Sequence, residues 1–416
     1  RELIMAFNTS ISGLQAAQKD MGVISNNIAN VGTAGFKRSD ALFAEIYSAS
    51  LGGTGTQPGS GVTLERIRND FSQGSFEFTS SQLDLAVDGN GLFVLRDGAE
   101  PQFTRAGAFR LDNDGFVVTE SGANLQGFAA DANGRITTAL GNLQITNALL
   151  AQKPTETITF NGNLDARATA PSALDAAGNV INAVFNATDP DTYNFTSTST
   201  VYDSAGAAHQ VTLYFAKDTT AANQYNVTAS IDDAVQPETA SLIFDNTGVL
   251  DITSVTALNL ATYAPANANA QPINIDFSTI SGFGAPSATS GVTQDGYAAG
   301  QLAGFEFDRE GVAYASYTNG ETRAVGQVAL ATFTNLSGLQ AAGKTNFTAS
   351  TASGVAEIGA PDSGARGVIR PSALESANVD LTVELLALIE AQRNFQSNAQ
   401  AIQNENDASQ AILQLR

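Results

Sequence analysis

The sequence predicts a multidomain α+β protein with helical ends and a middle made of β-structure. Both ends carry apolar residues at alternating steps of three and four, the spacing of a single stripe along an α-helix. Between the ends, short apolar segments alternate with Asp-Gly and Asn-Gly turns, which is typical of antiparallel strands. At 416 residues the chain is too long for one ordinary core, so we expect several domains.

The N-terminal stripe predicts a helix from Asn8 to Val31, ended by the glycine-containing turn that follows it. Met5 is typical of a translation start, so the predicted helix does not include residues 1–4. Two series with a period of seven residues, offset by three, form the stripe. Its members are Phe7, Leu14, Met21, Ile28, Ala17, Ile24 and Val31. A stripe this narrow needs another helix to cover it.

A matching stripe begins near Glu375 and continues to the end of the chain. Its members are Leu381, Leu388, Phe395 and Ile402. Because a single helix with one apolar stripe is marginal in water, we expect both ends to be largely disordered in the free subunit. Their natural partners are each other and the same helices of neighbouring copies, which favours a subunit that polymerises through its ends. Taken alone, such a stripe would also suit an ordinary intramolecular core.

Helical ends around a β-rich middle predict nested domains that are discontinuous in sequence. The terminal helices would pair as a coiled-coil-like inner domain, and all-β domains would lie outside it. A Gly-rich stretch at 52–61 indicates a loop. The expected parts are an inner helical polymerisation domain (5–31 and 375–416), an irregular connector (32–75), a discontinuous β domain (76–150 and 296–374) and an inserted outer β domain (151–295).

The charge and composition exclude several classes of function. The formal net charge is −21, and residues 151–295 hold 14 acidic against 3 basic residues. Free nucleic acid is therefore excluded as a partner, because phosphate binding needs a basic surface. No apolar run approaches the ~20 residues of a membrane span, so we expect no membrane insertion. Polar residues interrupt the first 20 positions, so we also expect no cleaved signal peptide.

The sequence offers no constellation typical of an enzyme. It contains no Cys, which excludes thiolate catalysis, and no phosphate-binding Gly loop in a strand–helix setting. His209 is the only histidine and alternates with Val211 and Leu213, so we expect it to pack on a sheet as a structural residue. We predict no catalytic residue, cofactor or metal site. A secreted β-rich hydrolase or adhesin is the alternative from another class, because some acid pair among 41 will lie close together.

Two segments at the ends of the chain resemble those of a known family. The first runs Ser25-Asn26-Asn27-Ile28-Ala29-Asn30-Val31-Gly32-Thr33-Ala34-Gly35-Phe36-Lys37, and the second runs Leu374-Glu375-Ser376-Ala377-Asn378-Val379-Asp380-Leu381. Both are similar to signatures of the bacterial flagellar axial family of rod, hook and hook-associated proteins. Gly32 stands where the family usually has Asn, and Ala34 where it often has Pro. The matching positions are Asn26, Asn27, Ala29, Asn30, Thr33, Gly35, Phe36, Lys37, Asn378, Val379 and Asp380.

Segments in the middle of the chain resemble the hook-type members of this family, and the shorter rod-type members lack them. The residues concerned are Asn163, Leu164, Asp165, Tyr202, Asp203 and His209. The resemblance implies a structural subunit of a curved, flexible tube, the flagellar hook, which acts as a universal joint passing motor torque from rod to filament. A distal rod or hook-associated axial subunit is the alternative within the family.

The same resemblance implies where such a subunit is found and what it contacts. Family members leave the cell through the flagellar type III export apparatus without a cleaved signal and assemble outside it. The implied partners are copies of the chain itself, the distal rod protein, the hook-associated junction protein, the hook cap and the export apparatus.

Overall fold

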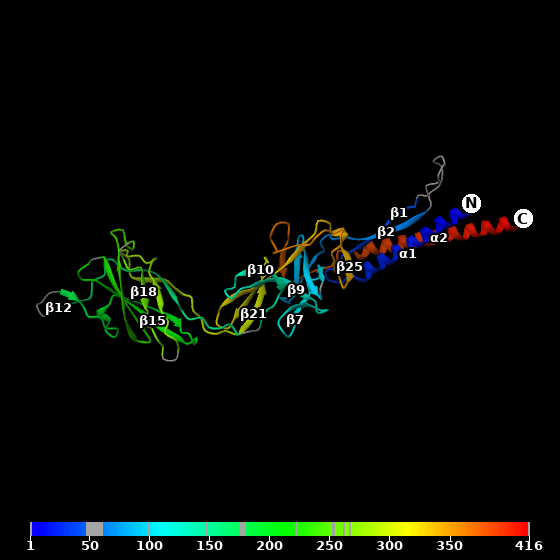
Figure 1. The fold of residues 1–416 in the computed structure, drawn as a ribbon. Helices are drawn as coiled ribbons and strands as arrows, with labels where there is room; N and C mark the ends of the chain where they lie inside the picture. Colours follow the sequence, from blue (N-terminus) through cyan, green and yellow to red (C-terminus); the bar gives the residue numbers. More distant parts are fainter. Residues whose placement is uncertain are drawn as a thin grey trace. The chain divides into compact units, whose positions relative to one another are not determined.

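The computed structural model describes residues 2–46, 61–98, 100–146, 149–174, 180–221, 223–251, 254–260, 263–265 and 268–414. Nearly all of the Gly-rich stretch at 52–61 therefore lies outside the described residues. The chain forms two compact units (Figure 1). Unit 1 comprises Arg1–Asn147, Gly304–Ala315 and Thr322–Arg416, and unit 2 comprises Ala148–Ala303 and Ser316–Glu321. The predicted inserted domain, 151–295, falls inside unit 2, whereas the terminal helices share unit 1 with β-structure instead of forming a unit of their own.

The two helices are α1 (Glu2–Ala29) and α2 (Leu381–Gln414). Figure 1 shows them side by side, with the N- and C-termini at the same end of the pair. Neither described helix has the combination of length and apolar character needed to cross a membrane.

Both predicted helix boundaries near the signatures were wrong by a few residues. α1 starts before Asn8, and includes residues 2–4, and it ends at Ala29, so Val31 lies in the turn beyond it. α2 starts at Leu381 and not near Glu375, which belongs to a strand. The reason for the later start is Asp380, whose Oδ1 accepts hydrogen bonds from the backbone N–H groups of Thr382 (2.8 Å) and Val383 (3.2 Å) and so caps the helix.

The connector at 32–75 is not irregular, which corrects the prediction. It contains the antiparallel hairpin of β1 (Ser39–Glu45) and β2 (Val62–Asn69), with a bulge between Leu42 and Phe43. A two-stranded hairpin is marginal alone. This one lies along α1, where the Oγ of Ser12 accepts a hydrogen bond from the backbone N–H of Val62 at 3.1 Å.

Most of the β-structure of unit 1 is one 13-stranded sheet whose main path is β21-β22-β23-β9-β5-β6-β26-β25. Part of its core is the buried cluster around Leu92, Val94, Phe103 and Phe347. The strands are β5 (Leu92–Asp97), β6 (Glu100–Thr104), β7 (Phe109–Leu111), β8 (Val117–Thr119), β9 (Asn124–Ala130), β10 (Ile136–Asn142), β21 (Leu302–Phe307), β22 (Val312–Tyr317), β23 (Thr322–Val328), β24 (Leu330–Thr332), β25 (Gln340–Gly343), β26 (Asn346–Thr348) and β27 (Glu357–Gly359).

Two short strand pairs complete unit 1 close to where α2 begins. They are β3 (Phe76–Phe78) with β29 (Ala373–Glu375), and β4 (Leu85–Asp88) with β28 (Val368–Pro371). A short 3-10 helix, η2 (Leu336–Gly338), lies between β24 and β25. These pairs bring residues 70–90 next to residues 368–378, and so position the site described below.

Unit 2 consists mainly of two four-stranded sheets that share one core. Alternating apolar residues such as Val211, Leu213 and Phe215 point into it, and the rings of Phe160 and Phe215 lie 5.2 Å apart. The first sheet contains β18 (Ala257–Leu260), β19 (Ile273–Asp276), β11 (Thr157–Asn163) and β20 (Ala288–Gln294); the second contains β14 (Phe195–Tyr202), β15 (Ala208–Lys217), β16 (Gln224–Ile231) and β17 (Ala234–Ile243). The smaller elements are β12 (Ser172–Leu174), β13 (Val180–Asn182) and the 3-10 helix η1 (Pro190–Thr192).

Candidate assembly site

The helices α1 and α2 pack against each other in opposite directions. Asn27 near the end of α1 donates to Glu384 near the start of α2, with Nδ2 and Oε2 3.3 Å apart. At the other end of the pair, the Oγ of Ser10 lies 3.5 Å from Oε1 of Glu405. Gly13 lets the helices approach closely, because a Cβ there would come within 2.7 Å of the Asn398 side chain.

The predicted stripes meet in this pair but are only partly covered by it. Ala17 and Ile24 are buried, whereas Phe7 and Leu381 remain exposed. The other members of the two stripes are half-buried: Leu14, Met21, Ile28, Val31, Leu388, Phe395 and Ile402. The apolar surface of the two ends is therefore not fully covered within one chain.

Beside the predicted stripe member Leu381, the start of α2 carries four more exposed apolar residues that the sequence prediction did not assign to a contact surface. We call these five residues the α2 patch: Leu381, Val383, Leu385, Leu386 and Ile389. Each of these side chains is between 44% and 63% exposed. These residues stand in the sequence as a nearly continuous apolar run over 381–389. A single series with a period of seven includes only one residue in every seven, so it contained Leu381 and left the other four out. Exposed large apolar side chains clustered on one element mark an interaction surface.

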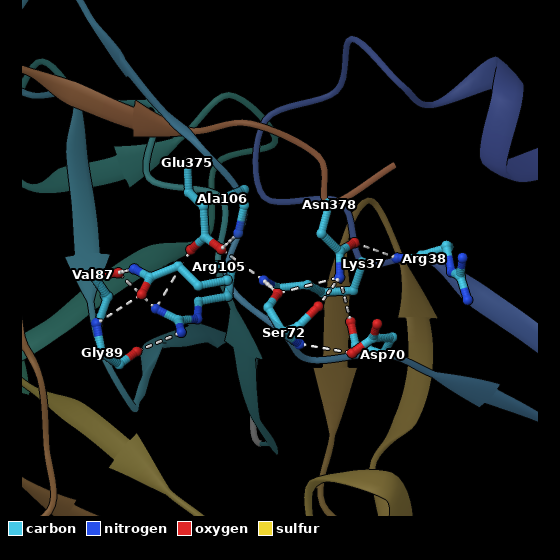
Figure 2. Close-up of polar contacts among 12 residues, drawn as sticks. Lys37, Arg38, Asp70, Ser72, Val87, Gly89, Arg105, Ala106, Glu375 and Asn378 are labelled. Carbon is cyan, nitrogen blue, oxygen red and sulfur yellow. Dashed lines mark hydrogen bonds and ion pairs between the residues drawn. The ribbon is translucent and has the colours of Figure 1, made fainter. Parts of the chain in front are cut away.

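Behind the helices lies a buried cluster of charges, which we call the ionic joint: Lys37, Arg105 and Glu375 (Figure 2). Lys37 follows α1, Arg105 follows β6, and Glu375 ends β29. The Nζ of Lys37 lies 2.6 Å from Oε1 of Glu375, and both side chains are fully buried. The same Oε1 accepts a hydrogen bond from the backbone N–H of Gly74 at 2.9 Å.

Arg105 completes the ionic joint from the β-sheet side. Its Nη1 lies 3.4 Å from Oε2 of Glu375 and donates to the carbonyl of Val87 at 2.8 Å, and its Nη2 donates to the carbonyl of Gly89 at 2.6 Å. Burial lowers the pKa of the Lys37 ammonium and of the Arg105 guanidinium, and the Glu375 carboxylate opposes both shifts. Two buried cations therefore share one carboxylate.

Asn378 and Gly35 add hydrogen bonds to the backbone around the ionic joint. The Oδ1 of Asn378 accepts from the Arg38 N–H at 2.7 Å, and its Nδ2 donates to the Asp70 carbonyl at 2.8 Å. The N–H of Gly35 donates to the carbonyl of Glu375 at 2.7 Å. Gly35 has φ +70°, and a Cβ at this position would overlap the backbone of Ala106. Only glycine fits here without displacement.

Asn27 joins α1 to both the hairpin and α2. Its side chain is buried, and it exchanges two hydrogen bonds with the backbone of Ser39, at 2.9 and 3.0 Å, besides the one to Glu384. Acidic groups gather beside it. Burial raises the pKa of Asp20, and the nearby carboxylates of Asp40, Glu384 and Glu390 raise it further.

The remaining signature residues take no part in the ionic joint. Asn30 donates to Asn26 and accepts from Thr33, which forms a small network at the end of α1. Asn26 and Ala29 are exposed, and Phe36 and Val379 are half-buried.

The hook-type residues belong to unit 2 and make structural contacts within it. Leu164 is fully buried in the shared core. Asn163 accepts from the backbone N–H of Phe283 at 2.8 Å, and Asp165 pairs with Arg167. Tyr202 and Asp203 precede a turn, and His209 lies beyond it.

Comparison with protein families places this architecture in the bacterial flagellar rod and hook proteins. Residues 7–37 match the flagella basal body rod protein model, and residues 370–415 match the C-terminal model of the flagellar basal body rod FlgEFG proteins. Residues 86–166 match the flagellar hook protein FlgE/F/G D1 domain, and residues 163–297 match the flagellar basal body protein FlaE D2 domain.

Whole-chain relatives define the family more closely. The chain is 35% identical to the flagellar hook protein FlgE of Salmonella typhimurium over 99% of this chain and 100% of that one. It is 34% identical to FlgE of Escherichia coli K12 over the same shares, and 32% identical to FlgE of Borreliella burgdorferi over the full length of both. The chain belongs to the flagellar hook protein family. The crystal structure of Helicobacter pylori flagellar hook protein FlgE2 has a similar fold, with a TM-score of 0.54 at 15% identity. The superposition covers 72% of this chain and 100% of the Helicobacter pylori chain.

Proposed function

We propose that this chain is the structural subunit of a bacterial flagellar hook, which self-assembles through α1 and α2 into a curved tube. The observation that carries the proposal is the α2 patch, which stays exposed after the two helices have paired. Burying one such side chain against a neighbouring copy contributes roughly 1.5–3 kcal/mol. Five of them, repeated on every copy, are enough to drive association once the cost of ordering the helices is met.

The ionic joint supports a mechanical role for the subunit. It connects the helical pair to the β-sheet of unit 1 through buried charges and direct backbone contacts, so force applied to the helices would reach the sheet without passing through a loose linker. We infer that this connection lets a tube built on the helices transmit torque. The outer domain, predicted as 151–295, holds 14 acidic against 3 basic residues, about half of the acidic excess of the chain, so its contacts between copies would be polar and weak enough to slide as the tube bends.

The proposal includes the partners and location that the relatives suggest. The subunit would bind copies of itself along the tube, the distal rod protein at one end and the hook-associated junction protein at the other. The hook cap and the flagellar type III export apparatus would act during assembly, outside the cell, without cleavage of a signal peptide. The role is structural and not enzymatic, in keeping with the named relatives.

The test is polymerisation of the purified full chain carrying Leu386→Asp. Leu386 is the most exposed member of the α2 patch, so the substitution places a charge on the proposed contact without entering the helix pair. We expect a folded subunit that forms no tubes by electron microscopy under salting-out conditions that polymerise the parent chain.

The matched control is Val355→Asp, which changes an apolar residue of unit 1 that is 85% exposed and belongs to neither helix but to the loop between β26 and β27. It should polymerise like the parent chain. Leu388→Asp, at a half-buried position of the predicted stripe, should also prevent tube formation while the β-structure stays folded. Normal tubes from the Leu386→Asp chain would reject the proposed contact.

A further inference from the structure

His209 lies between two carboxylates in unit 2, at the start of β15. Its Nδ1 is 2.6 Å from Oδ2 of Asp232, and its Nε2 is 3.3 Å from Oδ2 of Asp203. The imidazole is 17% exposed, and the Asp203 side chain is 4% exposed. A neutral imidazole carries one N–H and one unprotonated nitrogen, so it can donate to only one of these carboxylates. Only the imidazolium, with a proton on each nitrogen, can donate to both.

Each of the two carboxylates also shapes a turn. Oδ1 of Asp203 accepts from the backbone N–H groups of Ala205 (2.9 Å) and Ala207 (2.8 Å), which closes the turn between β14 and β15. Oδ1 of Asp232 accepts from the N–H of Gln210 at 2.9 Å, and Asp232 itself has φ +49° in the turn between β16 and β17. His209 therefore joins two turns from different strand connections.

A third segment packs on the same imidazole. The ring of Tyr263 lies edge-on to it, with the centroids 5.7 Å apart. Burial raises the pKa of Tyr263 to about 12, with Asp232 and Asp203 adding to the shift, so its hydroxyl stays neutral. The charged and titratable side chains that contact His209 among the described residues are thus the two carboxylates and one neutral phenol.

We propose that protonated His209 is a clasp that holds these turns together and makes the stability of unit 2 depend on pH. The clasp is closed when the imidazole carries its second proton. It is weakened when that proton leaves, because an unprotonated nitrogen then faces a carboxylate.

The clasp acts next to the segment where the chain enters unit 2. The turn that Asp203 closes contacts Gln152, whose Nε2 donates to the Ser204 carbonyl at 3.3 Å. The backbone of the neighbouring Tyr202 makes two hydrogen bonds to Thr155, both at 2.9 Å: its N–H donates to the side-chain Oγ1, and its carbonyl accepts from the backbone N–H. Opening the clasp would therefore first loosen the contacts of residues 152–155, near the start of unit 2.

The direction of the pH effect follows from the titration of the imidazole. Burial lowers the pKa of His209, but the hydrogen bonds to Asp232 and Asp203 outweigh it and raise the pKa above the ordinary 6.5. A group whose pKa is raised by folding contributes its full stability below the unfolded value and loses it as the pH rises through the folded value. The stability of unit 2 should therefore fall on the alkaline side of 6.5.

The test uses the fact that His209 is the only histidine of the chain. In the full chain labelled with ¹³C-histidine, NMR gives one imidazole signal when unit 2 is folded and another when it is unfolded. A pH titration should give a midpoint above 6.5. Asp232→Asn should lower that midpoint measurably, whereas Asp233→Asn, an exposed acid of the same turn, should move it far less.

Urea unfolding followed by the same signals measures the effect on stability. The urea midpoint should be lower at about pH 8.5 than at about pH 5.5. His209→Gln, followed by backbone signals, should start lower at the acidic pH and change less between the two. The proposal is overturned if the imidazole midpoint lies at or below 6.5, if the two Asp→Asn changes act equally, or if the parent chain unfolds at the same urea concentration at both pH values. None of these readouts requires polymerisation.

Discussion

Lys37 and Glu375 are 338 positions apart, yet their side chains meet at 2.6 Å with no exposure to solvent. One follows the first helix and the other precedes the last, so this contact fixes both ends of the chain to the same point of the β-structure. Arg105 contacts the same carboxylate from the sheet. The ionic joint thus holds two positive charges and one negative charge. Removing the carboxylate and removing one cation should therefore change stability by different amounts, which experiment can separate.

Glu375→Gln should destabilise unit 1 far more than Lys37→Met. The first change leaves two buried cations without their shared carboxylate, which should cost about 3–5 kcal/mol of unfolding free energy. The second leaves one cation and one carboxylate, a balanced pair. Urea unfolding of the full chain at neutral pH, followed by circular dichroism, measures both. Glu77→Gln, an exposed acid on β3, is the control and should change little. A larger loss from Lys37→Met would contradict the charge balance described here.

Gly35→Ala should destabilise the junction between α1 and the sheet. The left-handed conformation at φ +70° costs a residue with a Cβ about 1–2 kcal/mol, and the added methyl must also displace the backbone of Ala106. We expect a total loss above about 2 kcal/mol in urea unfolding. Gly32→Ala is the matched control from the same turn, because a Cβ there meets nothing within 4 Å. Equal effects of the two substitutions would show that close packing at Gly35 does not matter.

Assembly should increase the helix content of the chain. Within one subunit, Ala17, Val23 and Ile24 of α1 and Ala391 of α2 are the buried apolar residues of the described helix pair, and so few do not offset the cost of ordering two long helices. We therefore expect the ends to be largely disordered in the free subunit and helical in the tube. Circular dichroism of the monomer and of the polymer at equal concentration tests this. The same helix signal from both would argue that the pair is already closed before assembly.

The sequence predicted the architecture well where the signal is periodic. Seven-residue spacing identified both helices, and Asp-Gly and Asn-Gly turns identified the β-rich middle. The hairpin of β1 and β2 was missed because Glu65, Arg66 and Arg68 interrupt its alternation, and because its stability comes partly from contact with α1. A prediction from local pattern has no access to that contact.

The site was predicted only in part, for a similar reason. Lys37, Asn378 and Gly35 were identified by resemblance to a family, which gave them no physical role. Glu375 lay in a similar segment but was not recognised as the partner of Lys37, because a single sequence does not record which charges meet across 338 positions. For the same reason, Arg105 was not singled out.

The antiparallel pairing of α1 and α2 has a consequence for the timing of synthesis. The ribosome synthesises α1 first and α2 last. Some 350 residues are therefore translated between the two helices before α1 can pair with α2. Unit 2 can fold as soon as its own residues have emerged. The pair of α1 and α2 cannot form until translation is nearly over, so the nascent chain carries an unpaired α1 segment for most of its synthesis.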